Sequence, residues 1–235
     1  MTPDSTSPVA LVTGGSQGLG LALTRALDAA GWRVLVDARH ADALRAAVAG
    51  LARVTALPGD VADPAHRAEL VTAVTELGRL DLLVHNASAL GPSPLPPLAD
   101  LPVADLERTL AVNVLAPLAL TQLLLDPLRT SRGTLVTVSS DAAVEAYPGW
   151  GGYGSSKAAL DQLAAVLAVE NPDLHVYAVD PGDMNTAMHQ RAFPGEDISD
   201  RPLPETVVPA LLRLAQQELP GGRYRAADLL AEVPA

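Results

Sequence analysis

Short apolar runs alternate with segments of helical length along this chain, and that order limits the folds open to it. The apolar runs that we interpret as strands cover Val9–Thr13, Arg33–Ala38, Arg53–Leu57, Leu80–His85, Gly133–Ser139 and Leu174–Asp180. The segments that we interpret as helices cover Gly18–Ala30, Ala41–Gly50, Pro64–Leu77, Val103–Leu128 and Tyr153–Glu170. Alternation at this spacing is typical of βαβ units, and continuous apolar strands suit a parallel sheet covered on both faces. We therefore expect an α/β fold with one doubly wound parallel sheet.

The length suits a single domain. At 235 residues the chain is at the upper end for one domain, and neither a repeat nor a linker interrupts it. We expect residues 9–235 to form that domain, after a short polar tail over residues 1–8 that is flexible. Two segments read as loops after the carboxyl ends of strands, which is where ligands bind in such sheets: Ala89–Pro102, with five prolines, and Asp183–Pro204. Residues 183–204 are the expected substrate loop.

Composition excludes several classes of protein. The formal net charge is −11, so nucleic acid is not an expected partner, because phosphate backbones are bound by clustered cations. Leu110–Leu125 is apolar but interrupted by polar residues, and it suits a buried or interface helix better than a membrane span. The first eight residues lack the basic and apolar regions of a signal peptide. The absence of cysteine fits a reducing cytoplasm, which is the location we expect.

Two catalytic classes are also disfavoured. The five histidines are scattered without a H-E-x-x-H pattern and there is no cysteine, so no metal site is expected. A serine hydrolase of the nucleophile-elbow type has a Gly-x-Ser-x-Gly motif, which this sequence lacks.

A glycine-rich segment follows the first expected strand and opens the first expected helix. It reads Thr13-Gly14-Gly15-Ser16-Gln17-Gly18-Leu19-Gly20. Glycines let the backbone turn tightly and approach a pyrophosphate, and the helix N-terminus supplies free N–H donors and a positive dipole end. Strand, glycines and helix come in the order that a dinucleotide site requires. We expect Gly14, Ser16, Gln17, Gly18, Leu19 and Gly20 to contact the cofactor.

Lys157 is the single lysine among 16 basic residues, and it lies four residues after Tyr153. Residues four apart share one face of a helix, so an ordinary surface pair is the alternative explanation. A compact ammonium next to a phenol favours the phenolate and should lower a tyrosine pKa that is ordinarily about 10. The pair therefore indicates acid–base chemistry.

With these residues in place, the chain resembles the short-chain dehydrogenase/reductase family. The glycine spacing Gly14, Gly18, Gly20 and the Tyr153–Lys157 pair carry the resemblance, which extends from Val9 to about Ala226. Further matches in the family's order are Asn86-Ala87-Ser88, Asn113, Ser139-Ser140 and Pro181-Gly182. The family usually has Asn-Ala-Gly at the first of these, so Ser88 departs from its pattern. The resemblance implies an NAD(P)-dependent oxidoreductase with a Rossmann fold and a small carbonyl or alcohol substrate.

The resemblance also implies roles for single residues. Tyr153 would be the general acid/base, and Lys157 would lower its pKa and bind the nicotinamide ribose. Ser140, 13 residues before Tyr153, would hydrogen-bond the substrate oxygen, and Asn113 would support a water-linked proton relay. The further cofactor contacts implied are Asp60, Val61, Asn86, Ala87, Ser88, Pro181, Gly182, Met184 and Thr186. For Asp60, a turn-forming Gly-Asp explains the sequence equally well.

The end of the second strand favours NADP(H) over NAD(H). An acid there binds a ribose 2′-OH and repels a 2′-phosphate, whereas an arginine accommodates the phosphate. By the family's spacing, the acid's position is occupied by Ala38 and is followed by Arg39, while Asp37 should point to the other face of the sheet. Gln17 argues the other way, since many NADP-users of the family have a basic residue in the glycine loop. NAD(H) therefore stays possible.

The sequence leaves the substrate and part of the function open. The alternatives to a carbonyl reductase are an NAD-dependent alcohol dehydrogenase and, in another class, a non-catalytic dinucleotide-binding or sensor protein. Candidate residues of the substrate pocket are Tyr147, Trp150, Met188, His189 and Phe193, together with the segment 89–102. Arg191 and Arg201 could meet an anion or be surface charges, and we favour the surface. By resemblance, the apolar stretches Leu110–Leu125 and Ala158–Val169 would form a homodimer or homotetramer.

Overall fold

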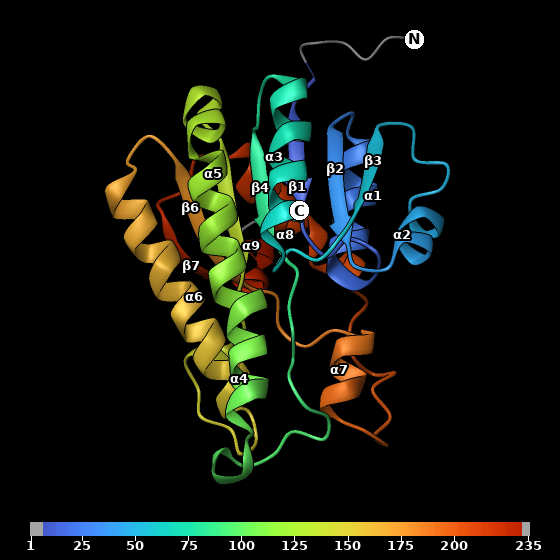
Figure 1. Ribbon diagram of the computed structural model, residues 1–235, viewed down its shortest axis with the longest axis vertical. Coiled ribbons are helices and arrows are strands. Elements are labelled where there is room, and N and C mark those ends of the chain that lie inside the picture. Colours follow the sequence, from blue (N-terminus) through green and yellow to red (C-terminus); the bar gives the residue numbers. More distant parts are fainter. Residues whose placement is uncertain (1–6, 232–235) are drawn as a thin grey trace.

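A computed structural model describes residues 7–231, and the seven strands within them form one parallel sheet (Figure 1). The strands are β1 (Val9–Val12), β2 (Arg33–Ala38), β3 (Val54–Pro58), β4 (Leu82–His85), β5 (Thr134–Val138), β6 (His175–Asp180) and β7 (Gly222–Arg225). Their order across the sheet is β3-β2-β1-β4-β5-β6-β7, and every neighbouring pair is parallel. The order reverses between β1 and β4, which is where such sheets bind ligands. The doubly wound parallel sheet is confirmed.

Helices connect the strands. They are α1 (Gly18–Ala29), α2 (Ala41–Ala47), α3 (Pro64–Leu77), α4 (Val103–Leu110), α5 (Ala116–Ser131), α6 (Gly151–Glu170), α7 (Ala187–Ala192), α8 (Val208–Gln216) and α9 (Ala226–Ala231). The ends of α3 show how local sequence sets the bounds. The Asp63 side chain accepts a hydrogen bond from the amide of Ala65, proline occupies the first helical position, and Gly78 ends the helix at φ 75°.

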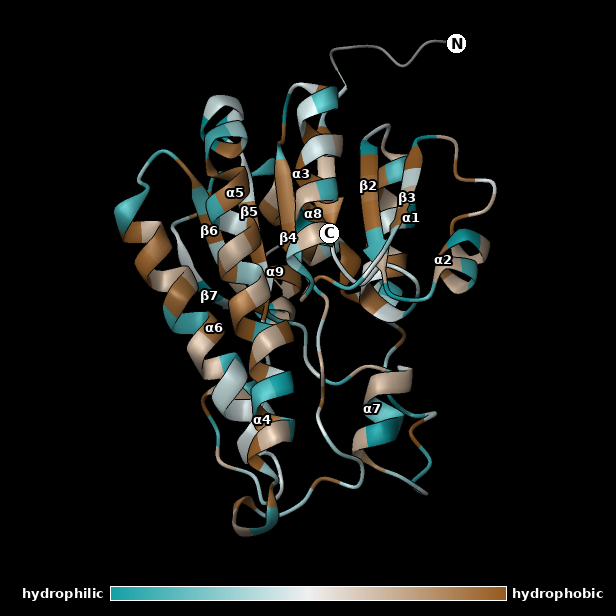
Figure 2. Cartoon of the chain, in the orientation of Figure 1, coloured by the Kyte–Doolittle hydropathy of each residue, from teal (hydrophilic) through white to brown (hydrophobic). Residues whose placement is uncertain are grey.

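Helices cover both faces of the sheet (Figure 1). On one face, α1, α8 and α9 pack against alternate strand residues such as Val12 and Val136. On the other face, α3, α5 and α6 pack against the residues between them, such as Leu11 and Leu135. In Figure 2 the strands between the helical layers are largely brown, which marks a sheet buried on both sides. This layering leaves the carboxyl ends of the strands open for a site.

One long helical segment changes its winding in the middle. Residues Val103–Ser131 are helical throughout, but Ala111–Leu115, between α4 and α5, form a π-helical turn. Single π turns within α-helices are frequent at functional sites. By length and composition alone this segment could cross a membrane, although a core helix passes the same test. Leu120, Leu124 and Leu128 are fully buried in the core, as expected of a core helix.

Several elements were not predicted from the sequence. The seventh strand, β7, extends the sheet beyond β6. The helices α8 and α9 were also missed, and α7 lies within the expected substrate loop. Residues 1–6 of the predicted tail lie outside the described residues. The carbonyl of Pro8 accepts a hydrogen bond from the amide of Arg33, so the chain is held to the sheet from that point.

Candidate active site

A cavity of about 290 Å³ lies at the carboxyl ends of the strands. Most of the predicted site residues line it: Gly14, Ser16, Gln17, Gly18, Leu19, Arg39, Asp60, Val61, Asn86, Ala87, Ser88, Ser140, Tyr153, Lys157, Pro181, Gly182, Met184 and Thr186. Gly20 and Asn113 do not line it. The fold therefore brings together, around one cavity, residues from both halves of the chain.

The glycine loop leaves the first turn of α1 open to an anion. Gly14 and Gly18 have φ values of 71° and 55°, which strain any residue with a side chain. Gln17 is the N-cap residue, and its side chain makes no capping hydrogen bond. The first amide groups of α1 therefore keep their donors for a ligand such as a pyrophosphate.

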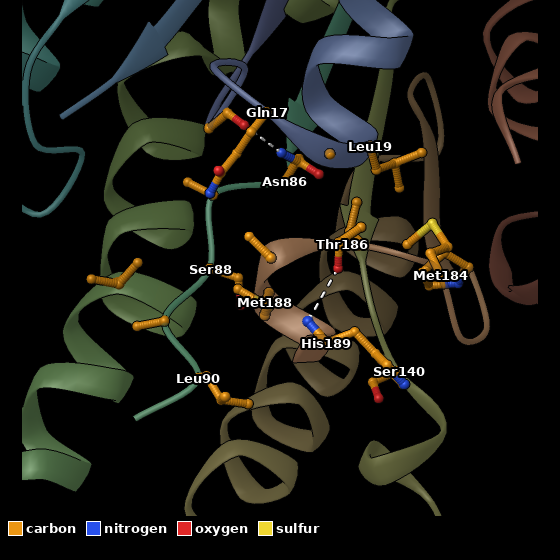
Figure 3. Close-up of a pocket in the computed structure, with 18 of the residues that line it drawn as sticks. Gln17, Leu19, Asn86, Ser88, Leu90, Ser140, Met184, Thr186, Met188 and His189 are labelled. Carbon is orange, nitrogen blue, oxygen red and sulfur yellow. Dashed lines mark hydrogen bonds between the residues drawn. The ribbon is translucent and has the colours of Figure 1, made fainter. Parts of the chain in front are cut away.

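Gly20 supports this loop from behind. A Cβ atom at this position would come within 2.4 Å of the Asn86 side-chain nitrogen and 2.5 Å of the Gly14 carbonyl oxygen. That nitrogen donates hydrogen bonds to the carbonyl groups of Thr13 and Gly14, at 2.9 and 3.0 Å. Figure 3 shows Asn86 beside Gln17 of the glycine loop, with one dashed line at its nitrogen. Asn86 thus ties the segment after β4 to the glycine loop.

The end of β2 lies at the same cavity. Ala38 packs toward α2 and Asp37 lies on the opposite face, as the alternation of side chains predicts. Asp37 nevertheless borders the cavity, beside Ala38 and the exposed Arg39. The Asp60 side chain accepts the amide of Ala62 at 2.9 Å, so it forms the expected turn as well as lining the cavity.

Tyr153 and Lys157 lie together in the first two turns of α6, which begins at Gly151. Both side chains are buried, and the Lys157 Nζ atom lies 5.5 Å from the centre of the Tyr153 ring. The same Nζ donates a hydrogen bond to the Val138 carbonyl oxygen, 2.7 Å away at the end of β5. The spacing of four residues therefore places the ammonium beneath the phenol, as predicted.

The effect on the tyrosine pKa is opposite to the prediction. Burial, as the largest cause, and the negative charges of Asp141 and Asp180 together raise the pKa of Tyr153 to about 12. Hydrogen bonding to Ser88 and Ser140 lowers this pKa but does not compensate. The prediction that Lys157 would lower the pKa is wrong for the protein by itself. Tyr153 therefore holds its proton at neutral pH.

Burial also lowers the pKa of Lys157 to about 8, while the nearby Asp161 raises it. Asp161 accepts hydrogen bonds from Ser139 at 2.7 Å and from Arg223 of β7 at 3.0 Å. Arg223 also bonds Asp180 at 3.1 Å. The last strand thus contributes an exposed arginine that binds the two acids next to the site, a contribution the sequence did not predict.

Ser140 is held by its neighbour in the chain. Its hydroxyl donates to Asp141 at 2.9 Å and accepts the amide of Ala142 at 3.2 Å. Ser139 turns the other way, toward Asp161, as expected for the second serine of the pair. Asp141 therefore orients Ser140 at the cavity, which the sequence analysis missed.

Asn113 lies in the π turn, fully buried behind the cavity wall. Its oxygen accepts the Ala89 amide at 2.7 Å and the Ser88 hydroxyl at 3.3 Å. Its nitrogen donates to the Ala89 carbonyl oxygen and to the Ser156 hydroxyl, both at 2.9 Å. The side chain thus joins α6 to the segment after β4, and its role in a proton relay stays a prediction.

Two loops enclose the far end of the cavity. Figure 3 shows Ser88 and Leu90 from the segment after β4, and Thr186, Met188 and His189 from the region of α7. Of the predicted pocket residues, Trp150, Met188 and His189 line the cavity. Tyr147 and Phe193 do not: the Tyr147 hydroxyl binds Asp141 and Glu145, and Phe193 packs behind Trp150 and His189. Ala89 and Leu90, from the predicted segment 89–102, also line the cavity, and the missed lining residues include Asp141 and Ala192.

Two hydrogen bonds join these loops, and each runs from a side chain of one loop to a main-chain carbonyl of the other. The Ser93 hydroxyl donates to the Arg191 carbonyl oxygen at 2.6 Å, and the Arg191 guanidinium donates to the Gly91 carbonyl oxygen at 3.3 Å. Arg191 is exposed, as predicted, yet it closes a bridge across the mouth of the site. Arg201 is paired with Asp183 and Asp200.

The fold and the site together define an oxidoreductase of the nicotinamide-dependent kind: a glycine loop on an open helix end faces a buried Tyr–Lys pair across one cavity. Residues 8–197 match the family model of short chain dehydrogenases, and the chain belongs to the short-chain dehydrogenase/reductase family. The fold, the site and the family all indicate an NAD(P)-dependent dehydrogenase or reductase.

Named relatives support the same class. Sepiapterin reductase of Mus musculus is 34% identical over 201 residues, covering 78% of this chain and 77% of that protein. The 2-(R)-hydroxypropyl-CoM dehydrogenase of Xanthobacter autotrophicus is 31% identical over 222 residues, covering 91% and 86%. A short-chain dehydrogenase of Shigella flexneri, solved in complex with NADP, is 28% identical with a TM-score of 0.88, covering 96% of this chain and all of that one.

Proposed function

We propose that the protein is an NADP(H)-dependent oxidoreductase that reduces a carbonyl to a secondary alcohol, or runs the reverse reaction, with Tyr153 as general acid/base. One observation carries the proposal. The buried Tyr153, the Lys157 ammonium beneath it and the Ser140 hydroxyl line the same cavity as the open glycine loop. A phenol at the substrate end and an anion site at the other end suit hydride transfer with proton transfer.

The residues divide the chemistry as follows. When bound, NADPH would supply the hydride that the carbonyl carbon accepts. Negative charge then develops on the carbonyl oxygen, and Ser140 and Tyr153 stabilise it by hydrogen bonding. Tyr153, whose phenol is protonated at neutral pH, transfers its proton to that oxygen. Lys157 provides positive charge under the ring and stabilises the phenolate that remains.

The preference for NADP(H) rests on Arg39. It is exposed at the edge of the cavity, one residue after Ala38 at the end of β2. A guanidinium there can bind a 2′-phosphate in two places at once. The solved Shigella flexneri relative with NADP supports this choice.

Arg39→Ala should weaken NADPH binding selectively. Loss of one charged phosphate contact is expected to raise the Kd for NADPH by roughly tenfold or more, with the Kd for NADH changed by less than about twofold. Fluorescence titration of both cofactors against the wild-type protein measures this. Arg45→Ala is the matched control, because Arg45 is an exposed arginine of α2 that does not line the cavity.

The wild-type titration also tests the function. Tight NADPH binding with weak NADH binding, followed by turnover of a carbonyl substrate, would support the proposed reductase. A preference for NADH would favour the NAD-dependent alcohol dehydrogenase. Binding of neither cofactor would overturn the proposal in favour of a non-catalytic protein, and an unchanged cofactor ratio in Arg39→Ala would contradict the role of Arg39.

The substrate end indicates an apolar group beside the carbonyl. Leu90, Trp150, Met188 and Ala192 line it, and the Trp150 ring packs edge-on against Tyr153 with 5.7 Å between ring centres. His189 adds one polar group, since its Nε2 atom is buried and has no hydrogen-bond partner within the described part of the chain. We infer a ketone with an apolar substituent and an atom able to hydrogen-bond His189.

The proposal includes self-association, a single domain over residues 9–235 and a cytoplasmic location. Large apolar side chains are exposed in the π turn, along α5 and along α6: Leu115, Leu123, Val166 and Val169. Burial of this surface between copies would remove apolar area from water. Light scattering of the purified protein should give the mass of a homodimer or homotetramer, and a monodisperse monomer would contradict the prediction.

A further inference from the structure

A buried ion pair lies directly behind the nucleotide end of the cavity. Asp37, near the end of β2, places its Oδ2 atom 3.3 Å from the Nε2 atom of His66, in the first turn of α3. The side chains are 2% and 4% exposed, respectively. The chemistry derived above uses neither residue, although Asp37 borders the cavity.

Asp37 also accepts hydrogen bonds from the glycine loop. Its Oδ1 atom accepts the amide of Gly14 at 2.8 Å, and its main-chain carbonyl accepts the amide of Gly15 at 2.9 Å. The carboxylate is therefore held between Gly14 and His66, with one oxygen directed to each. Its position is fixed by both elements.

His66 is held equally firmly. Its Nδ1 atom lies 3.3 Å from the Glu69 carboxylate, one turn further along α3. A Cβ atom on Gly59 would lie 2.1 Å from that Nδ1, so the ring packs directly on the strand end that precedes Asp60. The hydrogen bond to Asp37 is the largest cause that raises the pKa of His66, and it outweighs the effect of burial. The imidazolium form is thereby favoured.

An acid at this end of β2 would ordinarily oppose NADP. A carboxylate beside the cavity repels a 2′-phosphate and accepts a ribose 2′-OH, which selects NAD. Asp37 lines the cavity beside Ala38 and Arg39, so its charge acts on the same region. Pairing with His66 cancels that charge and occupies an oxygen that could accept a 2′-OH.

We propose that His66 is a specificity-determining positioning residue: it pairs with Asp37 and keeps this acid neutralised on the glycine loop, which permits a 2′-phosphate at Arg39. This inference rests on the proposed function, because it concerns the choice between NADPH and NADH. The effect is indirect, since His66 does not line the cavity and touches no ligand there.

His66→Gln tests the proposal by binding alone. Glutamine can still hydrogen-bond Asp37 but cannot carry a charge, so the carboxylate keeps its full negative charge near the 2′ position. The Kd for NADPH is expected to rise by roughly tenfold, with the Kd for NADH equal or lower, because one unpaired charge acts at short range in a partly buried site. His175→Gln is the matched control: it removes another histidine near a glutamate, and His175 does not line the cavity.

Removing the acid should reverse the effect. Asp37→Asn/His66→Gln has neither charge, so its NADPH-to-NADH ratio is expected to return to within about threefold of the wild-type ratio. A ratio that stays at the value of His66→Gln would overturn the proposal, as would an equal loss of both affinities in His66→Gln. If circular dichroism shows that His66→Gln does not fold, Asp37→Asn alone decides the test. A preserved or higher NADPH preference in Asp37→Asn supports the proposal, and a lower preference overturns it.

The proposed NADP specificity and the role of His66 can be overturned separately. A wild-type preference for NADH would contradict the proposed NADP specificity. The variant ratios, read relative to the wild type, would still report whether His66 neutralises Asp37. Conversely, a wild-type preference for NADPH with an unchanged ratio in His66→Gln would leave the proposed function intact and overturn this inference.

Discussion

Tyr153→Phe should lose about three orders of magnitude in kcat, because it removes the group that delivers the proton to the substrate oxygen. NADPH affinity should stay within about twofold, since the substitution leaves the glycine loop and Arg39 unchanged. The ring itself remains, so packing against Trp150 is kept. Steady-state kinetics and a fluorescence titration measure the two quantities on the same preparation.

Tyr224→Phe is the matched control for this prediction. It also deletes one tyrosine hydroxyl, but that hydroxyl donates to the Pro220 carbonyl oxygen, and Tyr224 does not line the cavity. Near wild-type turnover of Tyr153→Phe would refute its role as acid/base. The raised pKa of Tyr153 adds a pH signature: reduction needs the phenol and should proceed at neutral pH, whereas alcohol oxidation needs the phenolate and should accelerate as the pH rises.

Lys157→Met should lower kcat strongly without destabilising the protein at pH 7. The pKa of Lys157 is lowered from 10.5 to about 8, so burying its charged form costs about 3 kcal/mol relative to water. Methionine removes that cost but leaves the Val138 carbonyl without its donor, which costs about 1–3 kcal/mol. Thermal unfolding without cofactor should therefore give an equal or higher Tm, while kcat falls by about 10²-fold or more.

The stability difference between Lys157→Met and the wild type should depend on pH. Between pH 8 and 10.5 the unfolded chain binds more protons at Lys157 than the folded protein does, so the stability of the wild type rises with pH. The variant lacks this contribution, and its advantage should shrink across that window. Arg25→Met, which removes an exposed cation of α1, is the control and should show no such window. A large loss of stability at pH 7 in Lys157→Met would contradict the account.

The sequence predicted the sheet well because its central strands are continuous apolar runs. It missed β7, whose sequence is Gly-Arg-Tyr-Arg and whose side chains are only partly buried. Arg223 can occupy that strand because Asp161 and Asp180 lie beside it. Those acids come from α6 and the end of β6, so no local pattern could have indicated the partnership.

The sequence predicted which residues gather at the candidate site better than it predicted the contacts those residues make. The motif residues gather at the cavity because each follows the carboxyl end of a strand or opens a helix. Their roles stay predictions. Asn113 was expected near the reaction, but the π turn directs its side chain to Ala89 and Ser156. The tyrosine pKa was judged from neighbouring positive charge, whereas burial is the largest cause of its shift, and burial cannot be read from spacing.

The hydrogen bonds of Ser93 and Arg191 hold the two loops at the far end of the cavity together without using the residues that line it. Both acceptors are main-chain carbonyls, those of Gly91 and Arg191, so most of the residues around them can change without breaking these hydrogen bonds. Leu90 and Met188, which flank these anchor points, face the cavity. A mutant library restricted to such lining positions, with Ser93 and Arg191 kept, should therefore yield folded enzymes of altered substrate range at high frequency, which makes this enclosure a practical starting point for directed evolution.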